Sequence, residues 1–225
     1  MIAALLEVLP DTSKKVIEHN ATGFLTLTTG KMSSRKGNVL TGESLLEEMV
    51  GAALEKMGEN SKERDEEENY ELGEHIAVGA LKYQILRQSI GSDIVFDKEK
   101  ALSFEGDSGP YLMYTHARIA SLERKAHELQ LEASVASVPV ETYALEHIMY
   151  RFPEVVAQAQ QERAPHHIVV FLTELTGAFN TFYAHEKIID IEDQFSPYKL
   201  AIAGAVRITL MNGLTLLGIK APERM

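Results

Sequence analysis

Apolar and hydroxyl side chains alternate along residues 23–29, whose sequence is GFLTLTT. A period of two places alternate side chains on opposite faces, so this segment predicts a β-strand with one buried face. Apolar residues then recur at helical spacing after Thr41, which is placed to cap the predicted helix. The apolar stripe of that helix comprises Leu45, Leu46, Met49 and Ala53.

Residues 59–74 are strongly acidic, with the sequence ENSKERDEEENYELGE. We interpret this run as a linker or an exposed helix face, because concentrated like charges are usually solvated. Apolar residues at helical spacing resume before Ile76 and continue to Leu86. Gly91 and Ser92 then predict a break.

The remaining sequence predicts helix almost throughout. We expect breaks where Gly, Pro and small polar residues gather, at residues 106–110, 133–139, 152–153, 164–165 and 195–197. These breaks leave about five helices of the lengths found in helical bundles. Leu200 to Ile219 is apolar over nearly the length that a bilayer crossing needs, but Arg207 and Asn212 favour a buried bundle helix.

The composition indicates a folded globular protein, since 45% of the 225 residues are apolar. Cysteine is absent, which fits an intracellular protein and excludes disulfides and thiol nucleophiles. The first residues do not resemble a secretory signal, so we expect a cytoplasmic protein. The formal net charge of -11 disfavours nonspecific nucleic-acid binding, so any such site must be a local basic patch.

A basic patch of this kind follows the predicted strand, where residues 31–37 read KMSSRKG. Small residues let backbone N–H groups approach phosphate oxygens, while lysine and arginine neutralise their charge. The segment therefore indicates a nucleotide-phosphate loop. The alternative is an ordinary solvated basic loop, and the flanking strand and helix favour the phosphate loop.

Residues 106–110, GDSGP, resemble the nucleophile loop of trypsin-like proteases. We reject that function, because the segment precedes a helix in a cysteine-free, helix-rich chain. Asp107 or Ser108 is instead expected to cap this helix, with Pro110 in its first turn.

The helix that follows presents Tyr111, Tyr114, Arg118 and Lys125 on one face. Such a face can stack unpaired bases and hold phosphates. The residues alone favour the alternative that both tyrosines pack in the bundle with hydrated hydroxyls. The histidines have no convincing ligand spacing, and the adjacent His166 and His167 point in different directions, so we predict no metal site.

Several motifs together resemble the class I aminoacyl-tRNA synthetases, and within them the arginyl-tRNA synthetases. Residues 31–38 resemble the K-M-S-K-S loop, residues 104–118 the opening of the helical anticodon-binding domain, and residues 221–225 the family's C-terminus. Residues 96–97 and 174–183 resemble the same branch. The resemblance spans nearly the whole chain.

The resemblance implies a mainly α chain, with an anticodon-binding bundle after the last strand and loop of a Rossmann-like catalytic domain. We expect a catalytic-domain remnant at residues 1–42, a connecting helical segment at 43–100 and the anticodon-binding domain at 101–225. The family's His-x-Gly-His signature does not occur in this sequence. Half of the active site is thus missing, and the chain is expected to be inactive alone.

The implied reaction is ATP-dependent joining of arginine to its tRNA through an arginyl-adenylate. Lys31, Arg35 and Lys36 would be the catalytic cations, stabilising charge as pyrophosphate leaves. Met32, Ser33, Ser34 and Gly37 would complete the ATP-binding loop with Lys31. Ser34 stands where the family pattern has its second lysine. ATP with Mg²⁺ as its counterion is expected as a substrate of the parent enzyme, with no tightly bound cofactor.

The implied partner is an arginine tRNA, whose anticodon would meet Tyr111, Tyr114, Arg118, Tyr183 and Met225. We expect no DNA, no membrane and a monomer. One alternative is a stand-alone helical adaptor, derived from a synthetase, that binds proteins or tRNA. A class I synthetase of another amino-acid specificity is a second alternative, because most of the amino-acid pocket would lie outside this sequence.

Overall fold

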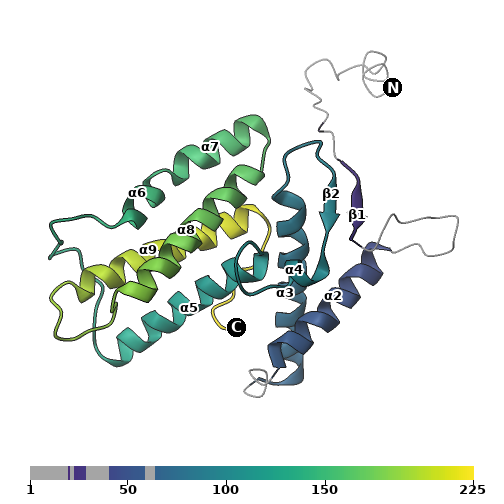
Figure 1. Cartoon of the computed structure of the whole chain (residues 1–225). Coiled ribbons are helices and arrows are strands. Elements are labelled where there is room, and N and C mark those ends of the chain that lie inside the picture. The colour runs from purple at the N-terminus through teal and green to yellow at the C-terminus, as the bar shows by residue number, and fades with distance from the viewer. Residues whose placement is uncertain (1–19, 21–22, 29–40, 59–63) are drawn as a thin grey trace, which may run out of the picture.

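The computed structural model describes residue 20 and residues 23–28, 41–58 and 64–225. Figure 1 shows two neighbouring groups of elements, a pair of helices with a short parallel ribbon and a bundle of helices beside it. The basic segment at 31–37 lies outside the described residues. Its flanking strand and helix are both described.

The predicted strand is confirmed as β1, Leu25–Leu27, which pairs in parallel with β2, Ile94–Phe96. Leu25 lies opposite Ile94, and the backbone N–H of Phe24 donates to Oδ1 of Asp93 at 2.8 Å. Parallel pairing requires a long crossover, which here runs through two helices. The sequence pattern did not predict β2, a strand of three residues.

The first crossover helix is α2, Gly42–Met57, and its predicted cap is confirmed. Thr41 Oγ1 accepts from the backbone N–H of Ser44 at 3.0 Å, and Ser44 Oγ accepts from the N–H of Thr41 at 3.0 Å. This reciprocal pair satisfies two of the free donors at the helix start. The stripe residues Leu45, Met49 and Ala53 are buried.

The second crossover helix is α3, Glu66–Leu86, with Asp65 as its cap. The acidic run from Glu66 onward is therefore a helix start, where carboxylates are favoured by the helix dipole. The side of α3 that faces the core buries Ile76, Ala80 and Tyr83. The exposed-helix interpretation of the acidic run holds for this part of it.

The bundle follows the short helix α4, Lys98–Ala101. Its members are α5 (Gly109–Glu128), α6 (Ala144–Tyr150), α7 (Phe152–Glu162), α8 (His166–His185) and α9 (Ser196–Leu216). Ser108 caps α5, since its Oγ accepts from the N–H of Tyr111 at 3.1 Å, and Pro110 lies in the first turn. The predicted five-helix bundle and the cap at Ser108 are thus confirmed.

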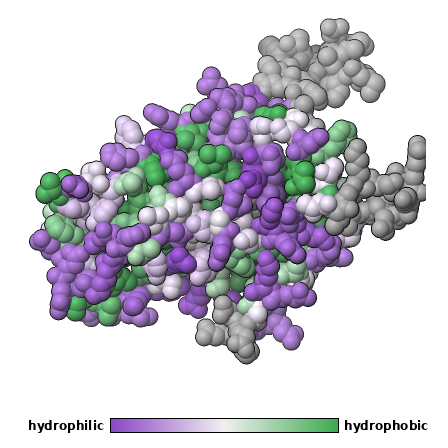
Figure 2. Space-filling model, viewed as in Figure 1, coloured by the Kyte–Doolittle hydropathy of each residue, from purple (hydrophilic) through white to green (hydrophobic). Residues whose placement is uncertain are grey.

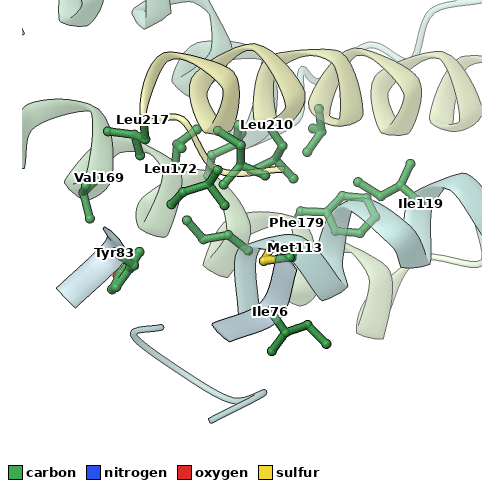
Figure 3. Packing of buried hydrophobic residues seen from close by; sticks show 14 of the residues in the cluster. Ile76, Tyr83, Met113, Ile119, Val169, Leu172, Phe179, Leu210 and Leu217 are labelled. Carbon is green, nitrogen blue, oxygen red and sulfur yellow. The ribbon is translucent and has the colours of Figure 1, made fainter. Parts of the chain in front are cut away.

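Helix α9 contributes Leu210 to the buried cluster drawn in Figure 3, although by length and composition it could cross a membrane. Val206, Leu210 and Leu214 on its inner side are fully buried. Leu172 and Phe179 of α8 are fully buried in the same cluster. The apolar character of α9 is explained by this packing, as predicted for a bundle helix.

A close backbone contact joins α3 to the start of α5. A Cβ added at Gly109 would lie 2.4 Å from the carbonyl oxygen of Gly79, a distance that no side chain tolerates. Nearby, the Tyr83 hydroxyl donates to Asp107 and lies 2.8 Å from Thr173 Oγ1 of α8, and Asp107 also pairs with Arg87. Burial and the Asp107 hydrogen bond raise the pKa of the Tyr83 phenol. Both contacts attach α3, the second crossover helix, to the bundle.

The connection between α8 and α9 is organised around a buried ammonium. Lys199 is 8% exposed and lies 2.6 Å from Glu186 Oε2 and 3.0 Å from Asp193 Oδ2. The backbone N–H of Phe195 also donates to Asp193 at 2.9 Å. The Phe195 N–H and the Lys199 ammonium together lower the pKa of the Asp193 carboxyl.

The contact at Gly109 predicts that Gly109→Ala lowers the free energy of unfolding by about 1–3 kcal/mol, because the new methyl group must push two helices apart. The matched control is Gly177→Ala on the exposed side of α8, where an added Cβ meets nothing within 4 Å. That change should raise the free energy of unfolding by about 0.5–1 kcal/mol. Urea denaturation measures both. Equal effects at the two glycines would contradict the close contact.

The lowered pKa of Asp193 predicts a pH-dependent contribution to stability. A carboxyl whose pKa is lower folded than unfolded stabilises the fold above its unfolded pKa of about 3.9, and this is lost as the pH falls through the folded value. Asp193→Asn should therefore destabilise the chain at pH 7, and the difference from the wild type should shrink below about pH 4. Thermal unfolding at several pH values measures this difference. Glu141→Gln, an exposed acid with no ion pair in the described residues, should show no such trend.

Candidate nucleic-acid interface

A guanidinium group lies between two tyrosine rings on one face of the bundle. The Cζ atom of Arg118 on α5 is 4.8 Å from the ring centroid of Tyr114 and 5.2 Å from that of Tyr183 on α8. Both distances permit cation–π attraction. Tyr114 is 37% exposed and Tyr183 41%, so each ring keeps surface available for a ligand.

Asn180 holds this guanidinium in place. Its Oδ1 accepts from Nη1 of Arg118 at 2.8 Å, while its Nδ2 donates to the Tyr111 hydroxyl at 2.8 Å and to Thr115 Oγ1 at 3.3 Å. The amide is thus occupied on both sides, which fixes its orientation. Asn180 precedes Tyr183 by less than one turn of α8, so one helix positions both the ring and the amide.

The two tyrosines and Arg118 line a hollow of about 550 Å³. Its other lining residues are Arg64, Ala117, Ser121, Arg124, Arg224 and Met225. With Arg118, four of the nine lining side chains are arginines, and none of the nine is acidic. Among the described residues, no carboxylate pairs with any of the four, so the hollow is a local positive patch on an acidic protein.

The C-terminal segment is fixed against α5, beside which the chain ends in Figure 1. Nδ1 of the buried His116 is 2.9 Å from the carbonyl oxygen of Pro222, and Nη1 of Arg124 donates to the Glu223 carbonyl at 3.2 Å. The Glu223 carboxylate pairs with Arg207 of α9 at 2.9 Å. These contacts hold Arg224 and Met225 at the hollow.

A second hollow of about 460 Å³ adjoins the first and shares Arg118, Ser121 and Tyr183 with it. It adds Lys125 of α5, Glu186, which pairs with Lys199, and Lys187, which pairs with Asp190 at 2.9 Å. The basic and aromatic surface therefore continues from the C-terminal segment along α5. A chain of phosphates and bases could follow it for more than one nucleotide.

The structure brings together four of the predicted anticodon-binding residues, Tyr114, Arg118, Tyr183 and Met225, at the first hollow. Tyr111 does not line this hollow. It is partly buried beside α8, and its hydroxyl supports Asn180. The alternative that a tyrosine packs in the bundle thus describes Tyr111, while Tyr114 and Tyr183 lie at the surface.

The predicted ATP-loop residues, Lys31, Met32, Ser33, Ser34, Arg35, Lys36 and Gly37, all lie outside the described residues. Sequence reasoning missed Arg64, Arg124, Arg224 and the role of Asn180. Arg124 follows Ser121 by three residues on the helix face that carries Arg118, so helical spacing could have found it. Arg64 and Arg224 approach only through tertiary packing.

No three side chains of the metal-binding kind gather within the described residues. His166 and His167 stack with their ring centroids 4.3 Å apart, and His167 lies 2.7 Å from Glu162. Burial lowers the pKa of His166. The tyrosine and arginine side chains of the hollow are of the kinds that stack on bases and neutralise phosphates.

Comparison with known proteins links this surface to a family. The family model described as "DALR anticodon binding domain" matches residues 112–225, and that described as "tRNA synthetases class I (R), catalytic domain" matches residues 1–98. The chain is 37% identical to the arginine–tRNA ligase of Pyrococcus abyssi, over 87% of this chain and 32% of that protein. It is 32% identical to the arginine–tRNA ligase of Oenococcus oeni, over 99% of this chain and 39% of that protein.

Solved structures give the same picture. The arginyl-tRNA synthetase of Thermus thermophilus superposes with a TM-score of 0.77 at 28% identity, over 91% of this chain and 35% of that one. The Plasmodium falciparum enzyme superposes with a TM-score of 0.73 at 23% identity, which shows the fold alone, over 100% of this chain and 38% of that one. The chain thus spans 32% to 39% of the length of these relatives. It belongs to the arginyl-tRNA synthetase family and carries the DALR anticodon-binding domain of that family.

Proposed function

We propose that this chain provides the tRNA-binding part of an arginine–tRNA ligase and recognises the anticodon of an arginine tRNA. One observation carries this proposal: Arg118 is fixed between Tyr114 and Tyr183 at a hollow lined by four arginines and no acidic side chain. Membership in the family supports it.

The anticodon suits this surface because its bases are single-stranded and can be splayed out of their stack. Proteins that read RNA loops stack such bases on aromatic rings and arginine planes. In our proposal, Tyr114, Tyr183 and Arg118 offer those surfaces, while Arg124 and Arg224 neutralise the adjoining phosphates. Met225 adds an apolar contact at the same hollow.

Tyr111 and Asn180 act behind this surface in the proposal. Neither lines the hollow, and together they hold the Arg118 guanidinium in one orientation. A fixed guanidinium loses less side-chain entropy when a base stacks on it. The predicted contact of Tyr111 with the anticodon is therefore replaced here by a positioning role.

We further propose that the parent protein joins arginine to tRNA through an adenylate, using ATP with Mg²⁺ as its counterion. Lys31, Arg35 and Lys36 would neutralise charge on the departing pyrophosphate, which is electrostatic rather than acid–base catalysis. The part of the sequence that holds them connects β1 to the capped start of α2. The His-x-Gly-His signature is absent from this sequence, so the ligation would require the longer parent protein.

The remaining parts of the proposal concern organisation. We place the protein in the cytoplasm as a monomer, with tRNA as its macromolecular partner and with neither DNA nor a membrane. Residues 1–42 would belong to the catalytic domain, 43–100 to a connecting segment and 101–225 to the anticodon-binding domain.

The proposed stacking site predicts a loss of tRNA affinity in Tyr183→Ala. Removing one base-stacking platform costs about 1–3 kcal/mol, which is roughly a tenfold to hundredfold rise in Kd. The measurement is a filter-binding titration at fixed salt with an arginine tRNA transcript, and with the same transcript carrying a changed middle anticodon base. We expect the wild type to prefer the native anticodon and the variant to lose most of that preference.

A second pair of variants compares Arg118→Gln at the hollow with its control, Arg151→Gln at the junction of α6 and α7. Arg151 is exposed and pairs with Glu174 away from the hollow. Only Arg118→Gln should weaken binding. Equal affinity of the wild type for both transcripts, or equal losses in the two arginine variants, would refute anticodon recognition at this hollow.

The separation of the two proposed sites predicts that Lys31→Ala affects catalysis in the parent protein but not tRNA affinity in this chain. In this chain the change should leave tRNA affinity unchanged, because Lys31 belongs to the ATP loop in our proposal. In the longer parent protein it should slow ATP–pyrophosphate exchange about tenfold or more, since a charge-assisted contact contributes about 1.5–3 kcal/mol. A tRNA affinity lost as strongly as in Tyr183→Ala would contradict the separation.

A further inference from the structure

A second concave surface lies between the end of α5 and the middle of α9, and the proposed function does not use it. It is a groove of about 910 Å³. Its apolar lining consists of Leu131 and Ala133 after α5 and of Leu200, Ala201, Gly204, Ala205 and Ile208 on α9. Ile208 is 53% exposed, so apolar surface reaches the rim.

The α9 side of this groove has the shape of a helix-packing site. Ala201, Gly204 and Ala205 follow one another at intervals of three and four residues, which places them on one side of the helix. None of them is fully buried in the bundle. Small side chains at this spacing let the axis of another helix approach closely at Ala201 and Ala205, while the Glu123 carboxylate lies beside Gly204. Ile208 continues the same line of residues, and Leu131 also lines the groove.

The charges around the groove are of one sign. Its lining includes Glu123, His127, Glu128 and Glu132 but neither lysine nor arginine. Glu123 is neutralised by Arg207, 2.8 Å away. Glu128 and Glu132 are exposed, and within the described residues neither has an ion pair. Their charges are thus available to a basic partner.

Further apolar surface continues from the groove into the connection between α5 and α6. Val135 is 70% exposed, Val138 52%, and Val140 fully exposed. The N–H of Ser134 donates to the carbonyl of Pro197 at 3.0 Å, which fastens this connection to the start of α9. Figure 2 shows apolar residues in green at the left edge, where Figure 1 places this connection.

The groove shares no lining residue with the arginine-lined hollow, and part of it lies on the side of α5 away from Arg118. Glu123 and His127 follow Arg118 by five and nine residues, which at about 100° per residue is roughly 140° and 180° around the helix. A ligand in the groove would therefore leave Arg118 and the two tyrosines beside it free, while Glu128 of the groove lies one turn from Arg124 of the hollow.

We propose that this groove binds a basic amphipathic helix of another protein, and that it does so while tRNA occupies the arginine-lined hollow. The small-residue side of α9, together with Ile208 and Leu131, receives the apolar stripe of the helix, as in other helix-in-groove complexes. Glu128 and Glu132 face its lysine or arginine side chains. A second copy of this chain suits the groove less well, because its net charge of -11 repels an acidic rim.

The test uses a fluorescein-labelled peptide of roughly 18 residues, or about five helical turns, built from leucine and lysine at amphipathic spacing. Anisotropy titration of this chain at about physiological salt should give saturable binding. A peptide of the same composition in scrambled order should bind at least tenfold more weakly. Equal binding of the two peptides would overturn the proposal, because it would reflect charge alone.

Two kinds of variant locate the site. Ala205→Trp fills the groove and should raise the Kd of the amphipathic peptide at least tenfold. Ala157→Trp, at an exposed position on α7, should leave that Kd unchanged. The double change Glu128→Lys with Glu132→Lys should raise the same Kd similarly without altering the groove's shape. Its control is Glu154→Lys on α7. Circular dichroism checks that each variant is folded.

Three results would overturn the inference: no saturable binding, equal binding to Ala205→Trp and the wild type, or release of the peptide by added tRNA. Sedimentation velocity tests whether a second copy of this chain occupies the groove. A dimer that Ala205→Trp dissociates would assign the groove to a second copy and overturn the proposal. Loss of anticodon preference in the hollow would leave this test unaffected, so the two proposals fail separately.

Discussion

The close backbone contact between Gly109 and Gly79 is the constraint on which the arrangement of this molecule depends. It sets how near α5 can come to α3, and the buried Tyr83 beside it extends the same junction to α8. Arg64 precedes α3 whereas Tyr114 and Arg118 belong to α5, so the hollow exists only if the two helices keep this spacing. The fold thus sets the geometry of the site through a contact that involves no functional side chain.

Within the site, hydrogen bonds decide how an arginine is oriented, whereas the number of arginines decides the positive potential. Four arginines repel one another, and their repulsion is tolerated because the hollow is open to water. Within the described part of the chain, Arg118 is the one of the four that a side-chain amide fixes, and the other atoms of that amide are satisfied by Tyr111 and Thr115. Arg124 instead donates to a backbone carbonyl of the C-terminal segment. A single arginine is therefore oriented precisely, while its neighbours supply positive potential.

The sequence predicted those features whose signals are local. The caps at Thr41 and Ser108 are read from hydroxyl residues before a helix, and the bundle from apolar spacing between breaks. Strand β2 escaped prediction because three residues carry little periodicity and their pairing with β1 is distant along the chain.

The candidate site likewise divides into residues that local sequence spacing predicted and residues that only tertiary packing brings together. Tyr114 and Arg118 could be grouped by helical spacing, but spacing alone could not show that α8 covers Tyr111 and leaves Tyr114 exposed. Arg64 and Arg224 lie far apart in sequence, and only packing brings both to Tyr114. The basic segment at 31–37 was conspicuous in sequence, yet its chemistry remains a prediction.

The stacked arrangement around Arg118 also has a spectroscopic consequence. The chain contains eight tyrosines and no tryptophan, so its intrinsic ultraviolet emission comes from tyrosine. Two of these phenols flank the guanidinium at the hollow. The protein therefore carries its own optical reporter at the surface where bases would stack, and nucleic-acid binding there would be visible without an attached dye.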